Sequence, residues 1–332
     1  MDDNDRMMQM LTGYWVTQVV HAAATFSLAD HLASGPATAA DIAKAEGTDV
    51  LGTFRLLRAC TSLGLLVYEG ESRFAATPLL DTLRKDNPQG LLGFALTFPA
   101  PGHWLPWGRF TEAVRTGQSQ AIAALGMDVW NYFATQPVEG AAFISAMTNA
   151  TAGVAEEAAR AIDTSAVNVA VDIGGAGGEF LCALLQVNPN LRGVVFDRPQ
   201  VAAQATVTVA KSGFQERLTA VGGDFFESVP EADLYLLKHI LHDWEDGDCM
   251  RILENCRRAM RPGGRMIVID IVLGEIGEPG PAALIDLTMM VLLSGRERSL
   301  SEFQELFRLA GFRITNIIPT SSPASIIEAV VS

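Results

Sequence analysis

The sequence predicts an α/β protein that begins with an α-helical part and continues as a doubly wound, mostly parallel sheet of seven strands. The first third of the chain is rich in alanine and leucine at helical spacing. Beyond residue 165, helical stretches separate five strand-like apolar runs, which is typical of parallel strands joined by crossover helices. The expected strands are 168–174, 192–197, 218–225, 234–241, 265–273, 312–320 and 324–331. The last two are nearly contiguous, so at least one of them should be antiparallel.

The composition limits the class of protein. Of the 332 residues, 49% are hydrophobic and 19% are charged, which predicts a globular chain with a sizeable core. The formal charge of −14 argues against a nucleic-acid partner, because phosphate binding needs a local excess of lysine and arginine. The acidic start does not resemble a secretory signal, no apolar run predicts a membrane span, and the four cysteines are scattered. We therefore expect a cytoplasmic protein with reduced thiols.

The helical part contains a pattern typical of a winged helix. A helix at 13–32 would carry apolar side chains on several faces, so it needs burial against a second domain or a second subunit. Within 38–77 we expect a short helix, a turn at Gly47, a second helix that ends near Gly64, and a hairpin that turns at 69–72.

A winged helix can bind DNA, but the charge of this one disfavours that function. Residues 37–85 contain six Lys/Arg and six Asp/Glu, and only Arg55 and Arg58 fall on the presumed recognition helix. We expect a structural or dimerising role instead. The following aromatic stretch, 88–110, is expected to be loop-like, because prolines and glycines interrupt it.

The segment VDIGGAGGEF (171–180) reads as a strand, a glycine turn and a helix start. Glycine lets the backbone approach a ligand closely, and the helix start points N–H groups at it. The dinucleotide fingerprint G-x-G-x-x-G fails in both frames. From Gly175 the third glycine position is Phe180, and from Gly174 the second is Ala176. The loop therefore indicates a nucleotide-like ligand other than NAD.

Two acidic residues lie at the ends of the next two predicted strands. Asp197 could bind both hydroxyls of a ribose, and Asp224 with Phe225 could bind an adenine through its amino group and its ring face. Each aspartate could instead cap the next helix. Because ligands bind at the carboxyl ends of parallel strands, the glycine loop and these acids together favour a nucleoside site.

The stretch LKHILHDWEDGD (237–248) contains two histidines three residues apart. On a strand, side chains three apart point to opposite faces, so His239 and His242 converge only if the strand has ended and a helical turn has begun. His21, His31 and His103 are isolated elsewhere in the sequence. We therefore expect no metal site.

The ordered set VDIGGAGG, FDRP, GDFF, LKHILHDWEDGD, RPGG and GRERS resembles the small-molecule O-methyltransferases that use S-adenosylmethionine. That family includes plant caffeate-type, hydroxyindole and bacterial antibiotic-tailoring enzymes. The resemblance covers nearly the whole chain. It implies a Rossmann-like catalytic domain, an N-terminal winged-helix domain for dimerisation, and a homodimer.

The resemblance also implies how the cofactor, S-adenosylmethionine, would bind. Its methionine moiety would lie against Gly174 and its neighbours, its ribose on Asp197, its adenine by Asp224, and its sulfonium end near Lys238. The implied cofactor residues are Asp172, Gly174, Gly175, Gly177, Asp197, Gly223, Asp224, Phe225 and Lys238.

The family's general base is the histidine of its HDW motif, here His242. A phenol with a pKa of about 10 is mostly un-ionised at pH 7, and histidine is the side chain best suited to take its proton. Plant members place two acids beside this base, here Asp270 and Glu297. They usually have glutamate where this chain has Asp270, so Asp243 or a bridging water is an alternative support.

The resemblance implies a hydroxylated aromatic or polyketide-like acceptor. Its binding pocket would be lined by Trp104, Met147, Met289 and Met290. It divides the chain into a dimerisation domain (1–100), a connecting region that contributes to the substrate pocket (101–165), and a catalytic domain (166–332). Methylation of carbon or nitrogen, non-methylating chemistry on the same cofactor, and a winged-helix transcriptional regulator remain alternatives.

Overall fold

The computed structural model describes residues 2–87 and 89–332. These residues form two compact units. One contains the chain up to Trp104 together with Phe133–Asn149, and the other contains Leu105–Tyr132 together with Ala150–Ser332. The chain passes between the units within 101–165, the stretch predicted to be a connecting region. The predicted domain boundaries themselves stay a prediction.

The first unit contains the winged helix that the sequence predicted. Its small sheet has the strand order β1-β3-β2 and antiparallel pairs. Gly47 and Gly64 follow the two helices with φ of 68° and 76°, the left-handed conformation that ends helices. The elements are β1 (Ala37–Thr38), α3 (Ala39–Glu46), α4 (Val50–Ser62), β2 (Leu66–Gly70), β3 (Arg73–Ala76) and α5 (Pro78–Asp81).

The N-terminal helix exposes much of its apolar surface in this chain. The predicted single helix at 13–32 is divided in the structure, because a left-handed Ser27 separates α1 (Asp3–Thr25) from α2 (Leu28–His31). Ala23 and Ala24 are buried at the C-terminal end of α1. Its exposed apolar residues are Met7, Met8, Met10, Leu11, Tyr14, Trp15 and Val16.

The expectation that 88–110 is loop-like is wrong. The stretch contains α6 (Leu92–Thr97) and α7 (Pro101–Trp107). Pro101 occupies the first position of its helix, where its missing N–H costs nothing. Further helices are α8 (Phe110–Thr116), α9 (Ala121–Leu125), α10 (Val129–Thr135) and α11 (Pro137–Ala161).

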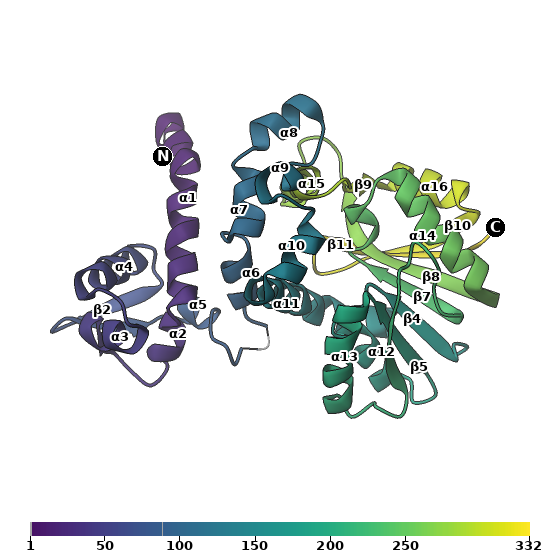
Figure 1. Ribbon diagram of the computed structural model, residues 1–332, viewed down its shortest axis with the longest axis horizontal. Helices are drawn as coiled ribbons and strands as arrows, with labels where there is room; N and C mark the ends of the chain where they lie inside the picture. The colour runs from purple at the N-terminus through teal and green to yellow at the C-terminus, as the bar shows by residue number, and fades with distance from the viewer. Residues whose placement is uncertain (1, 88) are drawn as a thin grey trace. The chain divides into compact units, whose positions relative to one another are not determined.

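The second unit is built on the predicted seven-strand sheet, in the order β10-β11-β8-β7-β4-β5-β6 (Figure 1). The pairs from β8 to β6 are parallel, and β11 is antiparallel to both of its neighbours. A two-residue strand, β9 (Arg298–Ser299), adds to β8. The seven strands are β4 (Val169–Ile173), β5 (Arg192–Asp197), β6 (Leu218–Gly222), β7 (Ala232–Lys238), β8 (Met260–Leu273), β10 (Phe312–Pro319) and β11 (Ala324–Val331).

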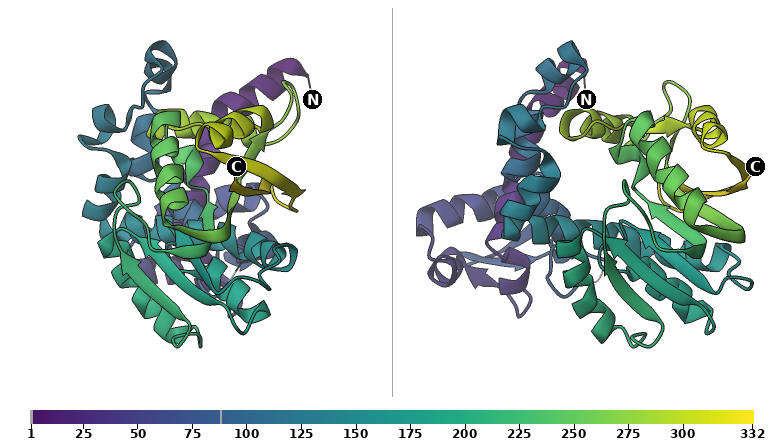
Figure 2. Two further views of the ribbon diagram at one scale, coloured as in Figure 1. Left: turned by 90° about the vertical axis from the view of Figure 1, so that its right-hand side faces the viewer. Right: turned by 45° about the vertical axis from the view of Figure 1, so that its right-hand side comes forward.

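Helices cover both faces of this sheet, as Figure 2 shows from two directions. Along β7, Leu234 and Leu236 pack in one core cluster, whereas Tyr235 and Leu237 pack in the other. Burial on both sides explains why this strand is an uninterrupted apolar run. The helices of this half are α12 (Glu179–Val187), α13 (Pro199–Lys211), α14 (Asp246–Ala259), α15 (Ala282–Leu292) and α16 (Leu300–Leu309).

Within the described residues, no helix combines the length and the apolar character needed to cross a bilayer.

The parallel strands β4, β5, β6 and β7 end at Ile173, Asp197, Gly222 and Lys238. Most candidate site residues from the sequence follow these ends directly, at the edge of the sheet where ligands of this fold class bind.

Candidate active site

The two histidines lie where β7 ends and the chain turns. His239 has a left-handed backbone φ of 53°, and the short 3-10 helix η1 (Leu241–Asp243) follows. The turn stacks the rings of His239 and His242, with centroids 5.2 Å apart and an interplanar angle of 22°. The condition for convergence is therefore met, because the strand ends at Lys238 and a helical turn follows, whereas the predicted strand, 234–241, continued past His239.

Three carboxylates surround His242, and one of them is within hydrogen-bond distance. Glu297 Oε1 accepts a hydrogen bond from His242 Nδ1 at 2.8 Å. Asp270 Oδ1 lies 3.6 Å from the same nitrogen, and Asp243 Oδ1 lies 3.4 Å from Nε2. Glu297 lies in the strap, the segment 293–298 that leads from α15 into β9. Its backbone N–H donates to Asp286 Oδ1 at 2.9 Å, which fixes this segment. Of the three candidate supports, Glu297 is the one that bonds the imidazole.

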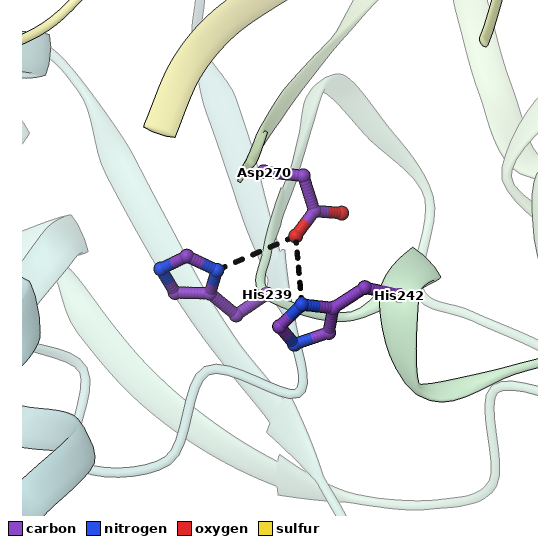
Figure 3. A group of neighbouring side chains, drawn as sticks. All are labelled: His239, His242 and Asp270. Carbon is purple, nitrogen blue, oxygen red and sulfur yellow. Dashed lines mark ion pairs between the residues drawn. The ribbon is translucent and has the colours of Figure 1, made fainter. Parts of the chain in front are cut away.

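Asp270 projects from β8 between the two imidazoles (Figure 3). It is fully buried, and its Oδ1 lies 3.4 Å from His239 Nδ1. Neither of its carboxylate oxygens has a hydrogen-bond partner among the described residues. A buried carboxylate without a donor is costly, so this position is adapted to a positive charge nearby.

The buried charges shift several pKa values. Burial disfavours the charged form of His242, but Asp270, Asp243 and Glu297 outweigh burial and raise its pKa to about 10. Burial lowers the pKa of His239 to about 4 despite the nearby Asp270. Burial raises the pKa of Asp243 to about 7 and also raises that of Glu297. At neutral pH the cluster therefore favours a neutral His239 and an imidazolium at His242.

Arg298 holds the backbone of the turn that carries His242. Its side chain is 1% exposed. The guanidinium donates to the carbonyl oxygens of Leu241 at 2.7 Å and Trp244 at 2.9 Å, and to Asp246 Oδ1 at 2.8 Å. Adjacent residues of one strap thus support the base in two ways, since Glu297 bonds its ring and Arg298 bonds the main chain on either side of it.

The glycine loop and Asp197 form a cradle between β4 and α12. Asp197 ends β5, and its carboxylate accepts the backbone N–H of Ala176 at 3.0 Å and of Arg198 at 2.7 Å. Gly174 has φ of 67°, and a Cβ there would collide with the Ile240 side chain. Helix α12 starts beyond this turn without a side-chain cap, which leaves N–H groups available to a ligand.

Two charged residues lie deeper beside this cradle. Asp172 is buried on β4, and burial raises its pKa to about 7 against the opposing charge of Lys238. Burial lowers the pKa of Lys238, and Asp172 opposes that shift. Gly175 and Gly177 belong to the same turn as Gly174. A polar ligand at the loop would therefore meet a buried carboxyl and a half-buried amine.

The candidate adenine residues follow β6. Asp224 is exposed, and its Oδ1 accepts the Phe226 backbone N–H at 2.8 Å, so part of its bonding capacity stabilises its own turn. Phe225 packs edge-on against Trp244, with ring centroids 5.9 Å apart. Gly223, just before them, lies so close to the Phe196 ring that a Cβ would be 2.5 Å from it.

The four candidate substrate residues are divided between the two units. Trp104 on α7 and Met147 on α11 belong to the first, and Met289 and Met290 on α15 belong to the second. All four are partly buried. Their role in substrate binding stays a prediction.

The sequence did not reveal Arg298 or the use of Asp246. Asp246 is in the first turn of α14, where a negative charge is favourable. It also receives hydrogen bonds from Arg298 and Arg296, however, which lie 50 residues or more further along the chain. The available signal was the GRERS segment, in which two arginines flank the glutamate.

Comparison with known proteins places the whole chain in one family. Residues 107–313 match the model of the O-methyltransferase domain, and residues 8–86 match that of the O-methyltransferase dimerisation domain. The phenazine O-methyltransferase PhzM of Lysobacter antibioticus is 36% identical over 324 residues, covering 97% of this chain and 95% of that protein. The mitomycin biosynthesis 6-O-methyltransferase of Streptomyces lavendulae is 36% identical over 96% of this chain and 92% of its own.

Solved structures of methyltransferases also match this chain over nearly its whole length. The crystal structure of LaPhzM has a TM-score of 0.96 at 35% identity and covers all of both chains. Human N-acetylserotonin methyltransferase, solved in complex with SAM, has a TM-score of 0.90 at 29% identity over 99% of this chain and 98% of its own. With its glycine loop, its strand-end acids and its supported histidine, this chain belongs to the O-methyltransferase family.

Proposed function

We propose that this protein transfers a methyl group from S-adenosylmethionine to a hydroxyl of an aromatic or polyketide-like small molecule, with His242 as the general base. The observation that carries the proposal is the 2.8 Å contact from His242 Nδ1 to Glu297. It commits one ring nitrogen to a carboxylate and leaves Nε2, which lies 3.4 Å from Asp243 Oδ1, for the acceptor's proton.

The cofactor is S-adenosylmethionine, and residues of the cradle suit it. The Asp197 carboxylate, held by two backbone N–H groups, would bind the ribose hydroxyls. The turn at Gly174 and the start of α12 would receive the methionine carboxylate, and Lys238 lies nearby as a positive charge. When bound, this cofactor supplies an activated methyl group, so the chain's own residues mainly have to align and deprotonate the acceptor.

The charge cluster favours proton transfer from a phenol. A phenol has a pKa of about 10, and the pKa of His242 is raised to about 10, so moving the proton from oxygen to Nε2 costs little free energy. Asp270, Asp243 and Glu297 stabilise the imidazolium that results. The same carboxylates keep His242 protonated at neutral pH before the acceptor binds. The neutral form, which can accept a proton, therefore becomes more abundant as the pH rises.

The test is methyl transfer by His242→Gln to two phenols, one with a pKa near 10 and one already ionised at neutral pH. We expect kcat to fall by about 10²–10⁴-fold with the first phenol and much less with the second, since the second needs no base. Cofactor affinity, measured by calorimetry, should not change. His31→Gln is the matched control, because His31 also pairs with a glutamate, Glu46, in the first unit. Equal losses with both phenols would contradict the base assignment.

Amines are a second acceptor class that one relative favours. The 8-amino-8-demethylriboflavin N,N-dimethyltransferase of Streptomyces davaonensis is 34% identical over 97% of this chain. A panel with labelled cofactor should therefore include aromatic amines beside phenols. Transfer to amines alone would replace the hydroxyl acceptor in this proposal.

We also propose a homodimer. The match of residues 8–86 to the dimerisation domain and the exposed apolar side chains on α1, from Met7 to Val16, support it. Light scattering on the full chain should give a mass near twice 35.6 kDa.

A further inference from the structure

Three potential metal ligands converge at the end of β7 and β8. They are His239, His242 and Asp270, whose ligand atoms lie within 4.8 Å of one another, and in both histidines Nδ1 is the nitrogen that faces Asp270 Oδ1. Figure 3 shows both imidazoles directing a nitrogen at the same carboxylate oxygen, at 3.4 Å from His239 and 3.6 Å from His242. Neighbouring parallel strands fix the two sides of this group, because β7 and β8 pair up to Lys238 and Ile269.

The bonding of these side chains is incomplete. Both oxygens of the fully buried Asp270 lack a hydrogen-bond partner among the described residues, and so does the buried His239 Nδ1. A buried carboxylate is stabilised either by a paired positive charge, here the imidazolium of His242, or by a coordinated metal ion. Asp243 and Glu297 add two further buried carboxyls beside His242, so the field at this point attracts positive charge.

The spacing and chemistry of the three ligands suit a borderline transition metal. Ligands held at about 2.0–2.2 Å in a tetrahedron stand about 3.4 Å apart, close to the 3.4 and 3.6 Å that separate Asp270 from the two nitrogens. Two imidazoles and one carboxylate match Zn²⁺, Co²⁺ or Ni²⁺, whereas Mg²⁺ prefers oxygen ligands. The His239 side chain is 23% exposed, which gives an ion a route to the group.

We propose that His239, His242 and Asp270 form a binding site for a divalent transition metal such as Zn²⁺, and that metal binding there inhibits methyl transfer. The metal would take the lone pair of His242 Nδ1 and displace the proton that this nitrogen shares with Glu297. In the imidazolium that proton leaves to solvent and the second ring proton stays on Nε2; in the neutral imidazole the Nδ1 proton moves to Nε2. Either way Nε2 carries a proton and cannot accept one from the acceptor. The inhibition rests on the proposed role of His242, but the binding does not.

Binding is tested without any turnover. Metal-free full-length protein is titrated with Co²⁺, and the visible absorption of tetrahedral Co²⁺ is followed, with Zn²⁺ as competitor. We expect saturation at one ion per chain, displacement by Zn²⁺, and no displacement by equal Mg²⁺. His239→Asn and Asp270→Asn should each weaken Co²⁺ binding by at least about tenfold. His31→Asn removes a histidine that pairs with a carboxylate elsewhere and should bind like wild type.

Two results would overturn the proposal. One is wild-type protein that shows no tetrahedral Co²⁺ absorption. The other is His239→Asn protein, folded by circular dichroism, that binds Co²⁺ as tightly as wild type and His31→Asn. His239→Asn also keeps the test decisive if Asp270→Asn fails to fold.

Inhibition is then measured as the ratio of each protein's rate with Zn²⁺ to its own metal-free rate. We expect wild type and His31→Asn to be inhibited and His239→Asn to need at least about tenfold more Zn²⁺. Metal binding without inhibition would contradict the role of His242 as base while leaving the binding site intact. Inhibition without Co²⁺ binding would contradict the site itself.

Discussion

Glu297 Oε1 and His242 Nδ1 lie 2.8 Å apart although their residues are 55 positions apart in the chain. The two side chains come from the strap before β9 and from the turn after β7. The contact selects Glu297 among three nearby acids as the one that orients the imidazole, and it leads to the first prediction.

Glu297→Gln should lower kcat by about 10²-fold or more with an un-ionised phenol, because an amide keeps the ring in place poorly and no longer stabilises the imidazolium. Cofactor affinity should be unchanged, which calorimetry can check. Glu305→Gln is the matched control, since Glu305 pairs with Arg308 on the surface of α16. Equal rates for wild type and Glu297→Gln would contradict the orienting role.

The rate should rise with pH above neutrality. The three carboxylates raise the pKa of His242 to about 10, so the neutral form that can accept a proton is the minor form at pH 7 and grows as the pH approaches that value. Asp270→Asn removes one of the charges that raise this pKa and should move the profile to lower pH. A profile of kcat/KM against pH, with one acceptor for both proteins, separates this shift from ionisation of the acceptor. Superimposable profiles would contradict it.

Arg298→Met should lower both stability and turnover. The substitution leaves the carbonyls of Leu241 and Trp244 without their charged donor, at a cost of at least about 2 kcal/mol. Arg296→Met is a stringent control, because Arg296 also pairs with Asp246 but is 45% exposed and should cost less than about 1 kcal/mol. Urea denaturation gives the stabilities. A role in placing His242 further predicts that the kcat loss, measured at a temperature where the protein is folded, is larger for an un-ionised phenol than for an ionised one.

Gly174→Ala should weaken S-adenosylmethionine binding by about tenfold or more. The added methyl group would meet the Ile240 side chain and would be strained at a left-handed φ of 67°, so the Ile240 side chain or the turn must move. Gly213→Ala is the matched control, since Gly213 has φ of 81° but open space around its Cβ. Calorimetric affinities for the two variants separate backbone strain from collapse of the cradle, and equal affinities would contradict the assignment of Gly174 to the cofactor site.

The sequence predicts the fold well because its signals are local. Apolar runs flanked by helices gave the parallel strands, and glycines at positions 47, 64 and 174 occupy left-handed conformations that few other residues adopt. The contact between the histidines could not be foreseen in the same way. It depends on a left-handed His239, a conformation that carries no glycine or asparagine signal and that tertiary packing imposes.

The supports of the base were partly predictable. Family resemblance indicated Glu297 and Asp270 but could not choose between them, because the choice depends on atomic distances of 2.8 and 3.6 Å from one nitrogen. Arg298 was missed because its partners besides Asp246 include carbonyl oxygens up to 57 residues away, and a main-chain acceptor leaves no trace in the identity of the residue that carries it.

That last property has an evolutionary consequence. Because Arg298 binds the main-chain oxygens of Leu241 and Trp244, a change of side chain at those two positions that preserves the core packing would leave these hydrogen bonds in place. The placement of the histidine can thus be inherited unchanged while the core behind it is repacked.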